Sequence, residues 1–292
     1  MENLASAIAA LRATPRGGPL DWALEYVQRS GKRHASTYEW ETRFELDGSG
    51  SAKLFRRRGP GDSHKLAPGS YRGNLAENDL LDFLATLAAS GIDQLRSETP
   101  NPRDPVNLFR VLIQGRLFAF SWGVLKPPVP LGVLQLRNEL SRLGKEACPI
   151  PEWNLALSVE SMTFEHGLVK ARLRIVNTGS REILIALPAS GGLGGEFGLH
   201  LKYGEAQLIE EGATPAPFEA KYALMDGTGQ LPSRFEAVQP GIPYPIEFSA
   251  ALEGTAPRGW VGRFGFLHYL ASDTVAGKPV FNGALFSEEK SW

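Results

Sequence analysis

Two segments of this chain alternate apolar and charged residues with a period of two, and this pattern most constrains the fold. In residues 38–46 one side of the period carries Tyr38, Trp40, Phe44 and Leu46, and the other carries Glu39, Glu41, Arg43 and Glu45. In residues 168–176 apolar residues alternate in the same way with Lys170, Arg172 and Arg174. Such alternation is typical of a strand with one buried and one solvated face. The chain is therefore expected to fold around half-buried antiparallel sheets.

Residues 1–147 combine this pattern with helical spacing, which predicts an α+β domain. A helix is expected at the N-terminus from Leu4, Ile8 and Leu11, and a second, short one from Asp21 to Ser30, ended by Gly31. Two hairpins follow, each with a helix after it, in the order ββαββα. The helices are predicted from apolar stripes at residues 80–87 and 133–143, the first with capping-box spacing at Asn74 and Glu77 and a Gly91 C-cap. We expect an antiparallel sheet with the helices on one face.

Residues 148–152, within EACPIPEW, are predicted to be a linker, and residues 153–292 have a different pattern. Many short apolar strands with turn signals between them fill this second part, and no helical spacing occurs. The pattern predicts an all-β sandwich of immunoglobulin-like type. A jelly roll or a barrel is the alternative.

Charge and cysteine content restrict the partners and the compartment. The 292 residues have a formal net charge of −1, so no overall attraction to nucleic acid or to an anionic membrane is expected. Cys148 is the single cysteine, which excludes an intramolecular disulfide. The N-terminal segment lacks the features of a signal peptide, and no run of 18 apolar residues occurs. We predict a cytoplasmic protein whose oligomeric state the sequence leaves open.

The segment Ile183–His200 is the nearest approach to a nucleotide-binding motif. Gly192 and Gly194 fit the first two positions of G-x-G-x-x-G, but Phe197 occupies the third. The residues that follow alternate like a strand, whereas a phosphate site needs a helix N-terminus there. We interpret the glycines as a turn between strands and predict no cofactor.

No catalytic or metal-ligand motif is found. His34, His64, His166, His200 and His268 are too far apart in sequence to form a short metal-binding motif, and Cys148 stands in the predicted linker, a poor position for a nucleophile. No nucleophile elbow occurs. The sequence therefore predicts no catalytic residues and no metal ligands. A hydrolase site assembled between the domains from distant histidines and acids is one alternative, and a carbohydrate-binding or structural module with aligned aromatic residues is another.

Arg56, Arg57 and Arg58 form the densest cluster of positive charge. The acidic strand 39–45 is their expected hairpin neighbour, so cross-strand pairing is the first interpretation, and binding of a protein partner is the second. Among the tryptophans, Trp122, Trp153, Trp260 and Trp292 are candidate interface anchors, because buried aromatic and arginine side chains dominate protein interfaces. The possible protein-binding residues are Arg56, Arg57, Arg58, Trp122 and Trp260.

Residues 38–144 resemble small bacterial protease inhibitors of the emfourin kind in the order and spacing of their elements. The resemblance is carried by TRFELDGSGSAKLF, ENDLLDFLATLAASGIDQL, NLFRVLIQGRLFAF and PLGVLQLRNELSRLG. In the second part, LVKARLRIVNTGSREILIAL and PGIPYPIEFSAAL resemble immunoglobulin-like modules of bacterial proteins. These likenesses imply a protein that binds rather than catalyses. We predict a non-enzymatic bacterial immunity or inhibitor protein that occludes a toxin or an enzyme.

Overall fold

A computed structural model of the chain describes residues 3–14, 18–34, 37–38, 40–58, 68–95, 101, 103–123, 129–187, 198–206, 217–224, 234–252, 260–268 and 273–291. The chain divides into two compact units. Unit 1 comprises Met1–Arg57 and Gly69–Glu152, and unit 2 comprises Arg58–Pro68 and Trp153–Trp292. The main boundary between the units therefore lies between Glu152 and Trp153. The segment of residues 58–68, which interrupts unit 1 in the sequence, also belongs to unit 2.

Unit 1 is built on six neighbouring antiparallel strands of a sheet, in the order β6-β5-β4-β1-β7-β8. Its strands are β1 (Trp22–Arg29), β4 (Glu41–Asp47), β5 (Ser51–Arg57), β6 (Gly69–Asn74), β7 (Val106–Ile113) and β8 (Arg116–Gly123). A short ribbon of β2 (Lys32–His34) and β3 (Thr37–Tyr38) stands between β1 and β4 in the chain. The earliest strand, β1, thus lies in the middle of the sheet, between β4 and β7.

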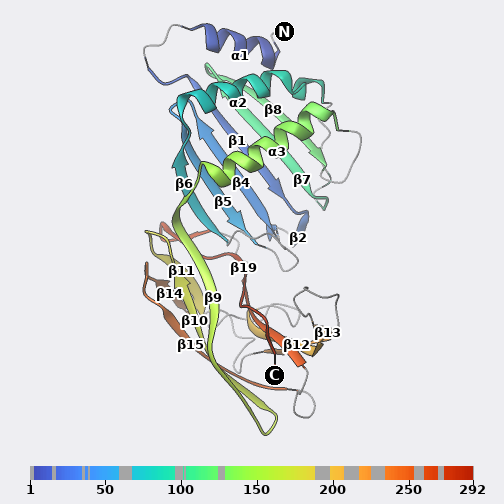
Figure 1. Cartoon of the computed structure of the whole chain (residues 1–292), viewed down its shortest axis with the longest axis vertical. Coiled ribbons are helices and arrows are strands. Elements are labelled where there is room, and N and C mark those ends of the chain that lie inside the picture. The colour runs from blue at the N-terminus through green and yellow to red at the C-terminus, as the bar shows by residue number, and fades with distance from the viewer. Residues whose placement is uncertain are drawn as a thin grey trace. The chain divides into compact units, whose positions relative to one another are not determined.

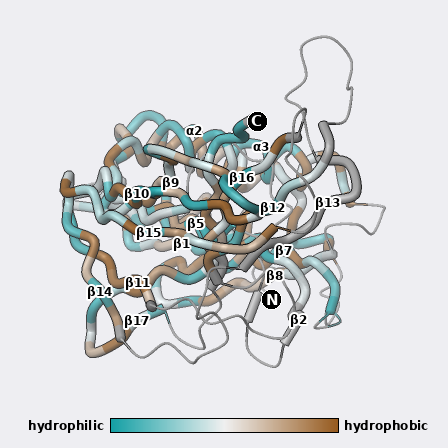
Figure 2. Tube along the Cα trace, turned by 90° about the horizontal axis from the view of Figure 1, so that it is seen from below, coloured by the Kyte–Doolittle hydropathy of each residue, from teal (hydrophilic) through white to brown (hydrophobic). Residues whose placement is uncertain are grey.

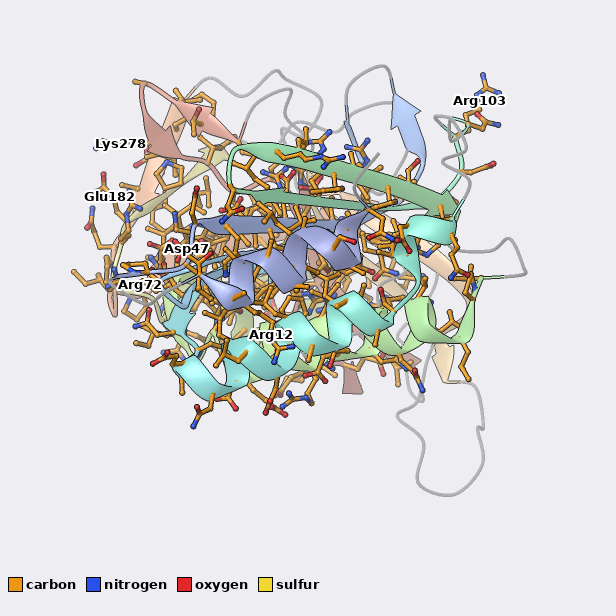
Figure 3. All side chains as sticks on the ribbon, turned by 90° about the horizontal axis from the view of Figure 1, so that it is seen from above. Arg12, Asp47, Arg72, Arg103, Glu182 and Lys278 are labelled. Atoms are coloured by element: carbon orange, nitrogen blue, oxygen red, sulfur yellow. The ribbon has the colours of Figure 1, made fainter. Side chains whose placement is uncertain are left out.

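Three helices lie on one side of this sheet (Figures 1 and 3). They are α1 (Leu4–Ala13), α2 (Glu77–Ala89) and α3 (Leu131–Glu146), and a short 3-10 helix, η1 (Ile92–Gln94), follows α2. The ring of Phe83 in α2 stacks on Trp22 of β1 at 6.2 Å. Gly144 of α3 approaches β4 and β5 so closely that a Cβ atom there would lie 3.4 Å from Leu54. The even-numbered residues of β4 and β5 therefore face the helices.

Several predicted elements of unit 1 are confirmed. The stripe of α2 is buried at each expected position, and Gly91 follows the helix with a φ of 65°, the left-handed conformation that a C-terminal glycine supplies. Helix α3 begins directly after Pro130, and its predicted apolar residues are buried. The hairpin of β7 and β8 turns at Gln114 and Gly115, both with positive φ, which is the geometry of a type I′ turn.

Other predictions for unit 1 are wrong. The short helix predicted for Asp21–Ser30 is strand β1, and strand β6, which the predicted order lacks, precedes α2. Residues 41–146 therefore run βββαββα, and the order ββαββα is not found. The predicted capping box is absent as well, because Ala76 is the N-cap of α2 and makes no side-chain cap bond. Residues 150–152 of the predicted linker are the first residues of the long strand β9 (Ile150–Glu165).

Unit 2 consists of strands alone in its described part. A three-stranded antiparallel sheet pairs β9 and β15 (Tyr244–Ala251) with the two edges of β10 (Leu168–Asn177). A second sheet has the order β13-β12-β16-β19, and β20 pairs with β16. Its strands are β12 (Gly198–Ala206), β13 (Pro217–Leu224), β16 (Trp260–His268), β19 (Gly283–Phe286) and β20 (Lys290–Ser291). Two small ribbons complete the unit, one of β11 (Ile183–Leu187) with β14 (Arg234–Val238) and one of β17 (Thr274–Val275) with β18 (Lys278–Pro279).

The buried sides of the two larger sheets in unit 2 contact each other. Phe248 of β15 meets Phe264 of β16 edge to face at 5.0 Å. The alternation predicted for residues 168–176 is confirmed, because Val169, Leu173 and Ile175 are fully buried while the basic residues between them are not. Hydrophobic and hydrophilic stretches accordingly alternate along the tube of this unit (Figure 2). At the edge of the unit an exposed ion pair joins Lys278 to Glu182 at 2.6 Å (Figure 3).

The predicted turn after β10 is fixed by one buried asparagine. The Asn177 side chain accepts hydrogen bonds from the amides of Asn154 and Gly179, and it donates to the carbonyl oxygens of Arg181 and Val238. Both polar atoms of a completely buried amide are therefore satisfied. The Asn-Thr-Gly sequence thus ties β9 and β14 to the end of β10.

Gly73 of β6 is required by the close approach of the chain that leaves α3. A Cβ atom at Gly73 would lie 1.7 Å from the carbonyl oxygen of Ala147, whereas one at Gly18 would meet nothing within 4 Å. We expect Gly73→Ala to lower the free energy of unfolding by roughly 1–3 kcal/mol, the range for overpacked sites. Urea unfolding measures this, and Gly18→Ala is the matched control. Equal stability of the two variants would contradict the close approach.

Candidate functional site

The side of the unit 1 sheet opposite the helices carries the polar and charged residues of the strands. We call it the open face, and its central residues are Ala23, Glu25 and Val27 of β1, Arg43, Glu45 and Asp47 of β4, Ser51 and Lys53 of β5, Arg72 of β6, Leu108, Arg110 and Leu112 of β7, and Leu117 and Ala119 of β8. Residues between these positions are buried toward the helices, as in Trp22, Leu24 and Tyr26. The alternation of each strand thus separates a core from a surface.

A row of charged residues crosses the open face at right angles to the strands. The register aligns Arg110, Glu25, Glu45, Lys53 and Arg72 on five neighbouring strands. Glu25 lies 3.1 Å from Arg110 and 3.8 Å from Arg43. Two carboxylates therefore stand opposite each other in the middle of the row, with cations on both sides. The attraction to these cations offsets the repulsion between the carboxylates.

An apolar row lies beside the charged one. Leu117, Leu112 and Ala23 are cross-strand neighbours on β8, β7 and β1. Leu112 is 40% exposed and Leu117 is 61% exposed. Single exposed leucines are common on proteins, but two in direct cross-strand contact form a small apolar patch.

A trough of about 360 Å³ lies between the two rows. Its walls include Leu112 and Leu117 at one end, Glu25 and Glu45 in the middle, and Lys53 at the other end. The Asp47 carboxylate at its rim accepts hydrogen bonds from the backbone amides of Ser49 and Ser51 and so holds the turn between β4 and β5. The trough is thus an open surface with one apolar end and with two central carboxylates between cations. It contains no cysteine or histidine to act as a nucleophile or base.

Arg56 and Arg57 are inside unit 1, on opposite sides of β5. Both side chains are buried. Arg57 stands opposite the buried Glu41 of β4 in the register, which agrees with the predicted pairing of this cluster with the acidic strand. Arg56 faces the helices near Tyr71, where burial raises the pKa of the tyrosine and the charge of Arg56 partly lowers it. Side chains in these positions support the sheet and offer little surface to a partner.

Arg58 belongs to unit 2 and is half-buried beside Phe286. Its guanidinium lies 5.3 Å from the centre of the Phe286 ring, and that of Arg263 lies 4.5 Å from it. The aromatic ring therefore interacts with two cations. The backbone carbonyl of Arg58 also accepts a hydrogen bond from Ala284. The three consecutive arginines thus occupy three separate environments and form no common patch.

Trp122 is only 7% exposed and packs inside the helix side of the sheet, where it stacks with Tyr26 at 6.4 Å. The hydroxyl of Tyr26 donates to Asn107 Oδ1 at 2.8 Å, and burial raises the tyrosine pKa. Trp153 is buried too. The side chain of Trp260 lies outside the described residues, as does Trp292. Of the six tryptophans, those with described side chains are buried or half-buried, so they give no exposed aromatic row of the kind a sugar site uses.

Histidines and acids form no metal site in the described part of the chain, where no group of three or more such ligands occurs. His166 is exposed in the turn between β9 and β10, and His200 is buried on β12 next to Gly265. A Cβ atom at Gly265 would lie 2.4 Å from His200 Nε2, so the glycine gives the imidazole its space. His64 and the glycines at residues 191–195, together with the side chains of His34 and His268, lie outside the described residues.

The trough does not follow from the sequence-based prediction, because β1 is predicted there as a helix. The segment WALEYVQR contains good helix formers, yet its aromatic and apolar residues Trp22, Leu24 and Tyr26 alternate with Ala23 and Glu25. That period of two was the signal that could have placed Glu25 beside Arg110. The charged faces of β4 and β5, by contrast, follow directly from the sequence pattern.

None of the helices in the described residues is long and apolar enough to cross a membrane. Comparison with models of protein families gives no match, and a search of curated proteins finds no similar sequence. A function for this chain can therefore be inferred only from its geometry.

Cys148 lies buried behind the last turn of α3, and burial raises the pKa of its thiol to about 12. We expect a thiol reagent at pH 8 to modify the folded protein much more slowly than the urea-unfolded chain, since only the thiolate reacts. Between pH 9 and 12 the unfolded thiol is ionised while the folded one is not, so the free energy of unfolding falls as pH rises. Cys148→Ala should reduce that decline. Equal labelling rates in the two states would contradict the burial.

Proposed function

We propose that the protein binds another protein through the trough and apolar row of the open face in unit 1. The observation that carries the proposal is the cross-strand contact of two exposed leucines, Leu112 and Leu117, beside the charged row led by Arg110. Protein interfaces usually combine an apolar patch with charged residues beside it. An open trough with neither cysteine nor histidine in its lining suits a binding surface better than a reaction site.

In such a complex the apolar row would supply affinity, and the charged row would supply orientation and a faster association. Leu112 and Leu117 bury apolar area, which supplies most of the affinity. The row from Arg110 to Lys53 presents cations on either side of Glu25 and Glu45, and a partner with the opposite pattern would be oriented by it and would associate faster at low salt. The ion pair of Glu25 with Arg110 keeps these side chains in place before binding.

The mechanism we propose is occlusion, as in a bacterial immunity or inhibitor protein that covers part of a toxin or an enzyme. A complex of standard size buries about 1,600 Å² in total. The resemblance of residues 38–144 to emfourin-like inhibitors in the order and spacing of their elements suggests this form of the proposal, although the chain has one more strand, β6, in that region. We also infer that unit 2 is a sandwich of immunoglobulin-like type, supported by the contact of Phe248 with Phe264 across two sheets. Arg58 and Trp260 of that unit are retained as candidate contacts.

Leu112→Ser tests the docking surface. The partner is first isolated from a native lysate with the full chain as bait and identified by mass spectrometry. Calorimetry with the purified pair should then show at least about a tenfold weaker affinity for Leu112→Ser, which corresponds to about 1.4 kcal/mol. Such a loss follows from removing an exposed apolar anchor without disturbing the core.

Leu131→Ser is the matched control, because Leu131 is 70% exposed at the start of α3, on the helix side of unit 1. It should leave the affinity unchanged. An equal loss for both variants would show that general surface hydrophobicity drives the contact. Unchanged affinity for Leu112→Ser would place the interface elsewhere and reject the proposal.

A further inference from the structure

Strand β8 is the edge of the unit 1 sheet, and in the described part of the chain no other strand pairs with its outer side. The two-residue turn at Gln114 and Gly115 makes Ile113 and Arg116 a hydrogen-bonded pair. Such pairs alternate along an antiparallel ladder. Phe118 and Phe120 therefore direct their backbone groups toward β7, and Leu117 and Ala119 direct theirs outward.

The outer side of β8 lacks the devices that usually protect a sheet edge. The strand has eight residues, RLFAFSWG, with no proline, and its register with β7 shows no bulge. Its one charged residue, Arg116, is at the start of the strand. Phe118 and Phe120 are only half-buried, and Leu117 and Ala119 are exposed. A long, regular and apolar edge of this kind favours pairing with another strand.

We propose that β8 pairs with β8 of a second copy of this chain, antiparallel and centred on Ala119, to form a two-fold symmetric dimer. Ala119 is the middle residue of the strand whose backbone faces outward, and its small side chain can lie against its own copy on the symmetry axis. The pairing joins the sheets of the two copies into one, as expected for an isologous contact.

The side chains of β8 are complementary to themselves in this register. Phe118 lies opposite Phe120 of the second copy, in the close, non-hydrogen-bonded type of pair, and the symmetry repeats this aromatic pair on the other side of the axis. Leu117 lies opposite Ser121 on the open face. The two copies of Arg116 stand at opposite ends of the contact, about 20 Å apart along the strand, so no like charges oppose each other. This charge arrangement favours a second copy over a strand of arbitrary sequence.

Analytical ultracentrifugation of the purified full chain tests the proposal without any other protein. The wild type should sediment with twice the chain mass of 31.8 kDa. Ala119→Lys places two like charges on the symmetry axis and should reduce the mass to that of one chain. A mixture of Ala119→Lys with Ala119→Glu should restore the dimer, because the axis then brings opposite charges together.

Ala23→Lys is the matched control, since it adds the same charge to the open face in the middle of the sheet, and it should remain dimeric. Ala119→Pro gives a second route, because it removes an outward N–H that β7 does not use, and edge strands tolerate such a proline. Circular dichroism checks that each variant is folded. A wild type with the mass of one chain at all concentrations would overturn the proposal, as would an Ala119→Lys variant as dimeric as the wild type. Leu112→Ser should not change the mass. The sedimentation experiment therefore tests the dimer independently of the docking surface.

Discussion

Strand β1 holds the sheet of unit 1 together, because one of its edges bonds β4 and the other bonds β7. Without it, the three strands β4, β5 and β6 and the hairpin of β7 and β8 would have no common partner. Side chains on its two faces also join it to β7. Tyr26 bonds Asn107 on the helix side, and Glu25 pairs with Arg110 on the open face. A buried hydrogen bond of this kind contributes about 1 kcal/mol, and the exposed ion pair contributes less.

The fold could be predicted where one periodicity dominated the sequence. The stripe of α2 around Phe83 and the alternation of β7 around Val111 each agree with a single type of element, so both were predicted correctly. In β1 the two signals conflict, because Ala23, Leu24 and Glu25 favour a helix while the alternation of Trp22 and Tyr26 favours a strand. Tertiary pairing with β4 and β7 decided the outcome, and local propensity could not show it.

The candidate site was harder to predict than the fold. The sequence indicated that the arginine cluster pairs across the hairpin with the acidic strand, and Arg57 does stand opposite Glu41 in the register. It gave Arg56 and Trp122 as contacts, yet both are buried, because a run of residues on a strand is divided between its two sides. The trough depends on Arg110 and Leu112 of β7 lying beside β1, strands more than 75 residues apart in the chain. Only the order of the strands brings such distant residues together.

The open face and the edge of the sheet are both exposed parts of strands, but the face is charged and the edge is apolar. On the face, the cations Arg110 and Lys53 on either side of two carboxylates keep a broad surface hydrated, and Leu112 and Leu117 are its large exposed apolar side chains. At the edge, β8 has no such charges beyond Arg116, so its backbone groups and phenylalanines are best satisfied by another strand. A charged face suits selective and reversible docking, whereas an apolar edge suits a lasting contact. The two interactions that we propose therefore have two different partners, a foreign protein on the face and a second copy of the chain at the edge.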